Sequence, residues 1–299
     1  MSEFSVAEGL PEAAPAAASR WRVVLRRALR SRSAVTGAVL LVLLFLLAFA
    51  GPYLTRWGYD DKDFTAFRQP PSPAHWFGTG PVGQDVFATT VRGMQKSLII
   101  GLLVAVVSTG LAGVVGAFAG YFLGAVDRAL MWVVDLLLVL PSFLMVAILS
   151  PLFQGSTWLL FVALLAAFMW MVTARIIRGM TMSLREREYV LAARYMGVPA
   201  PRIIFRHILP NVSSLLIVDA TINVSAAVMA ESALSYFGFG VQPPDVSLGT
   251  LLADASDDAT TYPWLFLFPA ATLVLIVLSV NLAGDGLRDA LDPGSGKAA

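Results

Sequence analysis

Hydrophobic positions form six long apolar segments along the chain, separated by shorter polar stretches. The segments run approximately over residues 34–55, 97–124, 129–150, 156–175, 212–236 and 263–284. Each is about as long as the roughly 20 residues that a helix needs to cross a bilayer. The pattern therefore predicts an all-α integral membrane protein with six transmembrane helices.

The polar stretches divide the chain around these spans. Because the first apolar run begins too late and is too long, a cleavable signal peptide is not expected. We expect a disordered tail at 1–19, a basic segment at 20–33, a first transmembrane helix at 34–56, an extracytoplasmic segment at 57–96, a core of five transmembrane helices at 97–290 and a C-terminal tail at 291–299.

The basic segment carries six arginines between Arg20 and Arg32. Its apolar residues are spaced as a stripe, which would let it lie on the membrane surface as an amphipathic helix. The alternative is a solvated positive flank. The stripe consists of Trp21, Val24, Leu25 and Leu29.

Composition and charge support the membrane class. The chain is 57% hydrophobic and 14% charged, with a mean hydropathy of +0.73, whereas a soluble domain has about a quarter charged residues. Of the 21 Lys and Arg residues, sixteen lie on the side of the membrane that holds the N-terminus and five on the other. The positive-inside rule then predicts that both termini and the polar stretch 184–211 are cytoplasmic. The absence of cysteine excludes disulfides and thiolate metal sites.

The stretch 184–211 is the longest polar break in the C-terminal two-thirds, and it predicts a helical elbow between two spans. Ser183 and Glu186 have the spacing of a capping box. Gly197 suits a left-handed C-cap, which would end the first helix of the elbow. One face of that helix would carry Tyr189, Ala192, Ala193 and Met196.

A second short helix is expected after the turn. Pro199 and Pro201 prevent simple continuation of the first helix, and Pro201 is well placed to open the second, which should stop by Pro210. The elbow would then offer small and basic residues to a partner. The alternative is a structured loop whose charges only fix topology.

Four polar side chains lie within the apolar spans: Asp135, Asp219, Asn223 and Glu231. An ionised carboxylate is costly in hydrocarbon, so these groups should face the bundle interior or water. One interpretation is a translocation path. The other is that they bond to neighbouring helices or, for Glu231, lie near the outer interface.

Small residues and a proline mark two other spans. Gly116, Gly120 and Gly124 form a doubled GxxxG spacing, which lets helices approach closely. We expect packing within the chain rather than a subunit contact. Pro141 should kink the third span.

The sequence does not predict an enzyme. No lysine lies in a phosphate-binding GxxxxGK[ST] motif, so the chain itself is not expected to hydrolyse ATP. The two histidines, His75 and His207, fall on opposite sides of the predicted membrane, and no metal-ligand spacing occurs. No cofactor, metal or nucleic-acid partner is expected. Four aspartates of the last outer loop either form a solvated acidic surface or attract cations or a binding protein: Asp245, Asp254, Asp257 and Asp258.

The elbow resembles a known docking loop. The order Ala192-Ala193, Gly197, Leu209-Pro210 is similar to the "EAA" loop of ABC-importer permeases, which docks into a groove of the ATPase subunit. The glutamate of that motif falls at Leu191 here, and Glu188 lies one turn earlier.

A second resemblance lies in the outer segment. His75, Phe77-Gly78-Thr79, Gly83, Asp85, Gly93 and Ser97-Leu98 follow the entry segment of dipeptide and oligopeptide permeases, with Gly80 and Gln84 as departures. Residues 231–244 and 281–293 resemble closing signatures of the same family. The chain is therefore identified, over about residues 20–293, as similar to the second, "C-type" permease of the peptide/nickel class of ABC importers.

The resemblance implies a type I ABC-importer fold in the bacterial inner membrane. Its implied partners are a homologous "B-type" permease, two ATPase subunits that bind ATP and magnesium, an extracytoplasmic solute-binding protein and membrane lipid. It assigns ATPase coupling to Glu188, Leu191, Ala192, Ala193, Arg194, Gly197, Leu209 and Pro210. ATP binding would move the elbows and switch the path between inward- and outward-facing packings.

Three other functions stay open on the sequence. The first is a permease of the same class for another cargo, such as nickel chelates, glutathione or a peptide antibiotic. A secondary transporter could instead run on protons through Asp135, Asp219 or Glu231. A membrane scaffold without transport would need neither an ATPase nor a proton path.

Overall fold

A computed structural model describes residues 26–153 and 158–291. These residues form a bundle of helices and, apart from the isolated bridges Lys62–Gln84 and Thr79–Asp85, contain no strand pairing. The all-α prediction is confirmed for this part of the chain. The predicted tail at 1–19, residues 292–299 of the tail predicted at 291–299, and the first residues of the basic segment lie outside it.

Within the described ranges, four helices are long and apolar enough to cross a membrane, and six spans result if each of two bent pairs counts as one. The four are Arg32–Tyr53 (α2, Arg32–Ala50, with the short η1, Gly51–Tyr53), Val86–Phe122 (α3), Ala200–Tyr236 (ending in α10, Leu209–Tyr236) and Pro263–Leu291 (α12). The bent pairs are α4 (Gly124–Val139) with α5 (Ser142–Leu149) and η2 (Ser150–Phe153), and α6 (Trp158–Met169) with α7 (Met171–Leu184).

The third span breaks at Pro141, as predicted. Its two halves meet at 83° because Pro141 has an extended backbone and cannot continue the helical hydrogen bonds. The fourth span bends by 49° at Trp170, where no proline marks the break. The sequence pattern did not predict that second bend.

Helix α3 begins eleven residues earlier than predicted. The Asp85 side chain accepts a hydrogen bond from the backbone N–H of Ala88 at 2.8 Å and caps the helix at Val86. Within the segment predicted as extracytoplasmic, residues 57–85 are loop and residues 86–96 belong to α3. At 37 residues the helix is about 55 Å long, so it extends beyond a bilayer core of about 30 Å.

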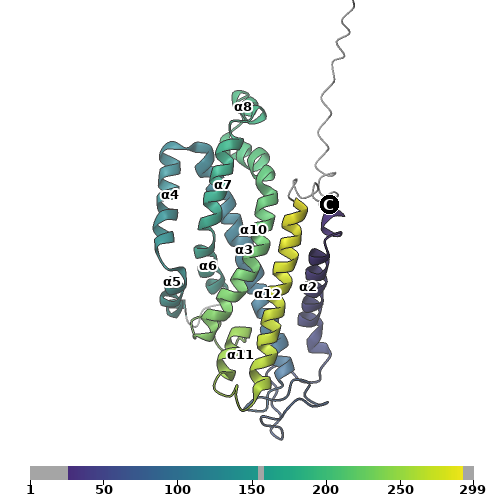
Figure 1. Ribbon diagram of the computed structural model, residues 1–299. Coiled ribbons are helices and arrows are strands. Elements are labelled where there is room, and N and C mark those ends of the chain that lie inside the picture. The colour runs from purple at the N-terminus through teal and green to yellow at the C-terminus, as the bar shows by residue number, and fades with distance from the viewer. Residues whose placement is uncertain (1–25, 154–157, 292–299) are drawn as a thin grey trace, which may run out of the picture.

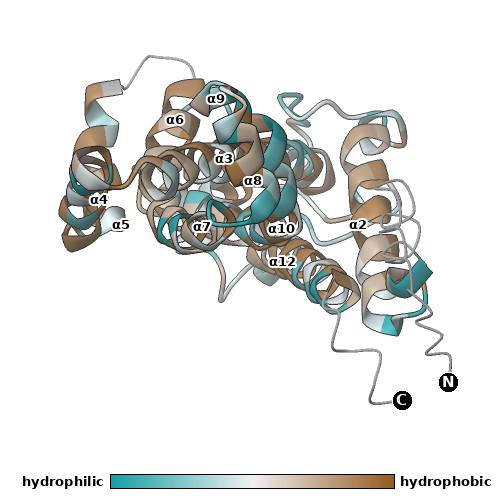
Figure 2. Ribbon diagram, turned by 90° about the horizontal axis from the view of Figure 1, so that it is seen from above, coloured by the Kyte–Doolittle hydropathy of each residue, from teal (hydrophilic) through white to brown (hydrophobic). Residues whose placement is uncertain are grey.

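Helix α3 lies at the centre of the bundle and packs against α7 and α10, while α12 pairs with α2 at one side (Figures 1 and 2). Gly116 and Gly120 face α7: a Cβ on either would lie 2.4 Å from the Ala174 carbonyl or 2.5 Å from the Arg178 carbonyl. The predicted packing within the chain is confirmed for these two. Gly124 instead forms the turn into α4 at φ +58°, with open space around it, and takes no part in this packing.

The close approach of α3 and α7 predicts a stability effect. We expect Gly120→Val to lower the thermal stability of the detergent-solubilised protein, because overpacking of this kind costs about 1–3 kcal/mol. The matched control is Gly110→Val on the same helix, where a Cβ meets nothing within 4 Å. Equal melting temperatures for the two variants would contradict the packing.

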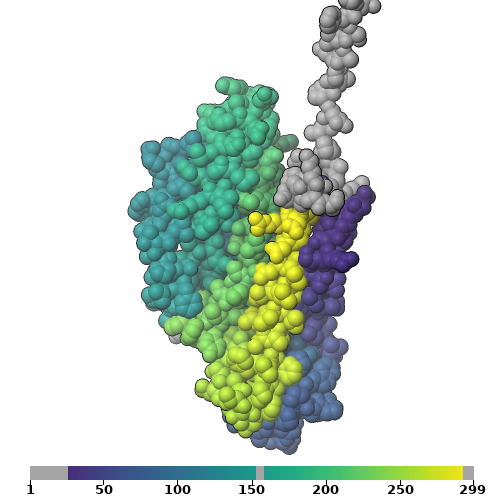
Figure 3. Space-filling model, viewed as in Figure 1, coloured from purple at the N-terminus to yellow at the C-terminus, as the bar shows by residue number. Residues whose placement is uncertain are grey.

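The polar elements gather at the two ends of the bundle. The elbow helix α8 (Glu188–Tyr195) projects at the end where α2 begins and α12 finishes, as Figures 1 and 3 show. Residues 57–85 and the short helix α11 (Leu248–Ala255) occupy the opposite end. This relative placement agrees with the predicted topology; which end faces the cytoplasm stays a prediction.

Candidate functional site

The elbow begins differently from its predicted start. Ser183 lies in the last turn of α7, and the backbone N–H of Arg185 still bonds the Thr181 carbonyl at 2.9 Å. Helix α8 starts only at Glu188, after Arg187, which provides no side-chain cap. The predicted capping box is therefore wrong, because α7 extends through the serine that would have formed it.

The end of α8 follows the prediction. Gly197 has φ +77°, its N–H bonds the Arg194 carbonyl at 3.0 Å, and the N–H of Val198 bonds the Ala193 carbonyl at 3.1 Å. This pair of bonds is a Schellman motif, which needs a left-handed residue at the glycine position.

The second elbow helix does not stop at Pro210. Helix α9 (Ala200–Ile203) runs into one π-helical segment, Ile204–Ile208, which continues directly into α10. The backbone N–H of Leu209 bonds the Ile204 carbonyl five residues back, and the Asn211 side chain donates to the His207 carbonyl at 2.6 Å. The wider turn accommodates the proline ring, so the elbow and α10 form one continuous helical segment.

Helix α8 has an inner and an outer face. Val190 and Ala193 are buried at 1% and 3% exposure, in a cluster that includes residues of α3, α7, α9 and the π-helical segment. The outer face of α8 is exposed and consists of Glu188, Tyr189, Ala192, Tyr195 and Met196. Figure 2, seen from the elbow end, shows α8 above the bundle with both hydrophilic and hydrophobic residues.

This division separates the predicted coupling residues. Ala193 and Leu209 pack within the chain's own core, where they position the helix, and Leu191 is half-buried. Glu188, Ala192, Arg194, Gly197 and Pro210 are exposed.

The sequence did not predict one contact that holds the start of the elbow in place. The Arg185 side chain donates to the Tyr121 carbonyl at 2.9 Å, close to the C-terminal end of α3, and to Glu186 at 2.8 Å. A cation near a helix C-terminus stabilises the helix, because the carbonyl groups there carry partial negative charge. The arginine therefore ties the start of the elbow to the central helix.

Glu231 is completely enclosed. It accepts hydrogen bonds from Ser97 of α3 and Ser235 of α10, each at 2.7 Å. The Ser97 hydroxyl also accepts from the backbone N–H of Leu248 (3.3 Å), and that of Ser235 accepts from Val241 (3.0 Å). The carboxylate thus joins α3 and α10 to the loop that leads into α11, the arrangement expected of a structural group.

Asp219 and Asn223 occur together where three helices meet. Asp219 accepts from Thr109 of α3 at 2.9 Å, from Thr173 of α7 at 2.7 Å and from Asn223 at 2.9 Å. Both α10 residues are half-buried. The group lies about 15 Å along α10 from Leu209, so it sits within the membrane-spanning part.

Two ion pairs connect α4 with α7. Asp127 binds both Nε and Nη2 of Arg178, at 2.5 and 2.6 Å, and is largely enclosed. Asp135 pairs with Nη2 of Arg175, and these side chains are 59% and 50% exposed. Of the four residues the sequence indicated only Asp135; the arginine partners lie 51 and 40 residues further along the chain.

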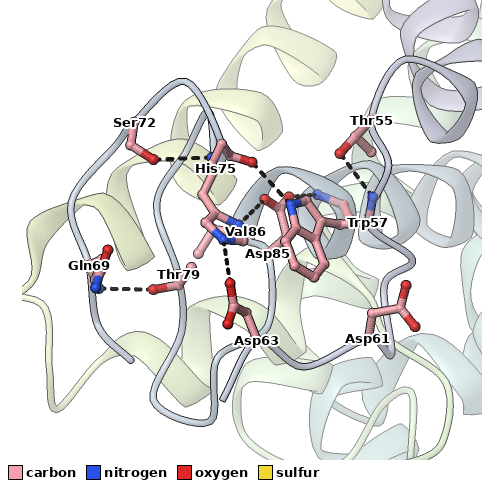
Figure 4. A network of polar contacts seen from close by, with 12 residues as sticks. Thr55, Trp57, Asp61, Asp63, Gln69, Ser72, His75, Thr79, Asp85 and Val86 are labelled. Atoms are coloured by element: carbon pink, nitrogen blue, oxygen red, sulfur yellow. Dashed lines mark hydrogen bonds and ion pairs between the residues drawn. The ribbon is translucent and has the colours of Figure 1, made fainter. Parts of the chain in front are cut away.

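The outer segment folds around His75, which is 3% exposed. Its Nδ1 lies 2.8 Å from Asp85, its Nε2 lies 3.4 Å from Asp63, and its ring stacks on Trp57 (Figure 4). Hydrogen bonds from Thr65 hold the pKa of Asp63 below its ordinary value. Because Asp85 also caps α3, the histidine couples the loop to the central helix.

Two aspartates of the last outer loop are held in ion pairs. Asp258 binds Arg68 at 3.0 Å, and Asp245 binds the nearly buried Lys96 at 2.9 Å, with Trp158 against the ammonium. Burial raises the pKa of Asp254. Across the described residues no three His, Asp or Glu side chains are arranged to hold a metal ion.

Two family models match the chain. The one described as "binding-protein-dependent transport system inner membrane component" matches residues 112–297, which is more than half of the chain. This chain belongs to that family. A second, described as the "N-terminal TM domain of oligopeptide transport permease C", matches residues 19–71 of the permease.

Similar proteins support the same family. The permease is 60% identical over 279 residues to an oligopeptide transport system permease protein, OppC, of Mycobacterium tuberculosis, covering 93% of this chain and 96% of the relative. It is 35% identical over 275 residues to the OppC of Bacillus subtilis, covering 92% and 90%. It is 39% identical over 269 residues to a putative peptide permease of Brucella suis, covering 89% of each. The permease is thus an integral membrane transport component and not an enzyme.

Proposed function

We propose that the permease is the C-type subunit of an ATP-driven importer of di- and oligopeptides in the bacterial inner membrane. It pairs with a homologous B-type permease, and an extracytoplasmic solute-binding protein delivers the cargo. Two ATPase subunits bind ATP and magnesium, and one of them docks on the elbow, which faces the cytoplasm with both termini. The family and the names of the relatives support this function.

The observation that carries the proposal is the outer face of α8. Tyr195, the last residue of α8, and Met196, its C-cap, are 86% and 75% exposed, although the other face of this helix is buried. Exposed aromatic and methionine side chains on a fixed helix are typical of a protein interface. The ATPase groove would receive this face, with Ala192 at its centre.

The elbow is connected to the interior by continuous structure. The buried face of α8 belongs to the same apolar cluster as Ile177 of α7, and α9 passes through the π-helical segment into α10. Thr173 of α7 and Asp219 of α10 are hydrogen-bonded to each other. A displacement of α8 would therefore reach this polar group through two helices, which is how ATP binding would switch the packing of the bundle.

The candidate path lies along α4, α7 and α10. Asp135, Asp219 and Asn223 remain partly accessible in the single chain, which is compatible with a path completed by the partner permease. Glu231 is enclosed, so we assign it a structural role, in which it joins α3 and α10 to the loop before α11, rather than a place in the path.

Co-purification tests the proposal. The tagged permease, extracted from its native membrane in mild detergent, is expected to bring a second permease and ATPase subunits in near-stoichiometric amounts. Peptide uptake by the reconstituted complex should depend on ATP and persist when the proton gradient is removed. Recovery of the chain alone, or uptake that follows the proton gradient, would contradict the importer.

A further inference from the structure

The two α4–α7 ion pairs differ in a way that points to a ligand. Both join the same two helices, which lie side by side (Figure 1). Arg178 uses two nitrogens on both oxygens of Asp127, whereas Arg175 offers a single nitrogen to a single oxygen of Asp135. The remaining N–H groups of Arg175 have no hydrogen-bond partner among the residues described.

The open pair lies well away from the elbow ends of both helices. Asp135 is eleven residues from the start of α4, about 16 Å along the helix, and Arg175 is nine residues from the end of α7, about 14 Å. Both helix ends lie at the elbow end of the bundle (Figure 1). Both helices pass the length and hydropathy test for membrane spans as parts of bent pairs, so the ion pair lies within candidate membrane-spanning segments.

A half-exposed ion pair at this depth does not suit a lipid-facing surface. Charged groups within membrane-spanning segments face water or protein, because hydrocarbon solvates them poorly. The exposed surface of α7 around Arg175 is otherwise uncharged and is formed by Val172, Ile176 and Gly179. The surface therefore combines apolar area with one guanidinium that has free donors.

We propose that Arg175 binds the C-terminal carboxylate of a peptide as it passes through the path, with Asp135 holding the guanidinium in place when no peptide is present. This proposal rests on the function proposed above. A guanidinium pairs with a carboxylate through two parallel hydrogen bonds. Every linear peptide with a free C-terminus carries that group, whatever its side chains, so the site suits a permease that accepts varied sequences.

The absence of cysteine from the chain allows a direct test. In the assembled complex, a single cysteine at Ile176, beside Arg175 on the exposed face of α7, is expected to react with a charged, water-soluble thiol reagent. A single cysteine at Leu278, exposed on α12, serves as the control for a lipid-facing position and should react at least tenfold more slowly. Similar slow reaction at both positions would overturn the proposal, since the face would then be covered by lipid or protein.

Protection of this cysteine from labelling by a bound peptide tests whether Arg175 binds the C-terminal carboxylate of the peptide. Saturating tri-alanine is expected to slow labelling of the Ile176 cysteine severalfold, and tri-alanine amide, which lacks the carboxylate, is not. Adding Arg175→Gln should abolish the protection, whereas the double variant Asp127→Asn, Arg178→Gln, at the enclosed pair, should retain it. Equal protection by both peptides, protection that survives Arg175→Gln, or none at all, would overturn the subsite. The importer itself fails only if ATP-dependent uptake by the wild-type complex is absent.

Discussion

Replacing Gly197 by aspartate is expected to abolish peptide uptake while the chain still inserts into the membrane. The residue has φ +77° and is exposed, and a Cβ there meets nothing within 4 Å. A side chain at this position costs about 1–2 kcal/mol of backbone strain, which deforms the Schellman motif. It also places a charge beside the outer face of α8. The measurement is peptide-stimulated ATP hydrolysis and uptake by the reconstituted complex.

The chain provides a control with the same local strain. Gly124 also has a positive φ, +58°, with open space where a Cβ would be, but it forms the turn between α3 and α4. Gly124→Asp should keep most of the uptake and retain the ATPase subunits through purification. Equal loss of uptake in the two variants would attribute the effect to strain, and the docking role of α8 would then be wrong.

Removal of the Glu231 carboxylate is expected to have the largest effect on stability. Glu231→Ala leaves the hydroxyls of Ser97 and Ser235 without their buried acceptor, and each such loss costs about 1–3 kcal/mol. The cavity left by the side chain adds to this cost. We expect little folded protein in the membrane and a clearly lowered melting temperature in detergent.

The conservative variant separates structure from transport chemistry. Glu231→Gln keeps the shape of the side chain and an oxygen acceptor, so we expect near-normal accumulation and most of the uptake. Near-complete loss of uptake in well-folded Glu231→Gln would show that the ionisable carboxyl itself is required. That result would favour the proton-coupled alternative over the structural role.

The site could be predicted only in part, and the reason differs between residues. Gly197 was predictable because a left-handed cap depends on one residue and its immediate neighbours. The inward position of Ala193 was not, since the residue fits a close contact equally well with a partner or with its own chain. Its burial is decided by α3, α7 and α9, which no pattern within the elbow describes.

The ion pairs show the same limit. Asp127 and Arg178 lie near the ends of predicted spans and read as flanking charges, yet they form the enclosed pair between α4 and α7. Asp135 was conspicuous because it interrupts an apolar run, but its partner lies 40 residues away. A charge in an apolar span indicates that the side chain needs a partner or water. The pattern does not show which helix provides that partner.

The sequence by itself determined the membrane class, the approximate spans, the break at Pro141 and the place of the elbow, because apolar length and backbone chemistry act over a few neighbouring residues. The tertiary structure alone decided that the elbow continues through Pro210 into α10 and that Glu231 is enclosed while Asp135 remains exposed. These outcomes depend on which helices meet, and Glu231 and Ser97 meet across 134 residues of chain. Side-chain burial and pairing are properties of that assembly, so local periodicity does not specify them.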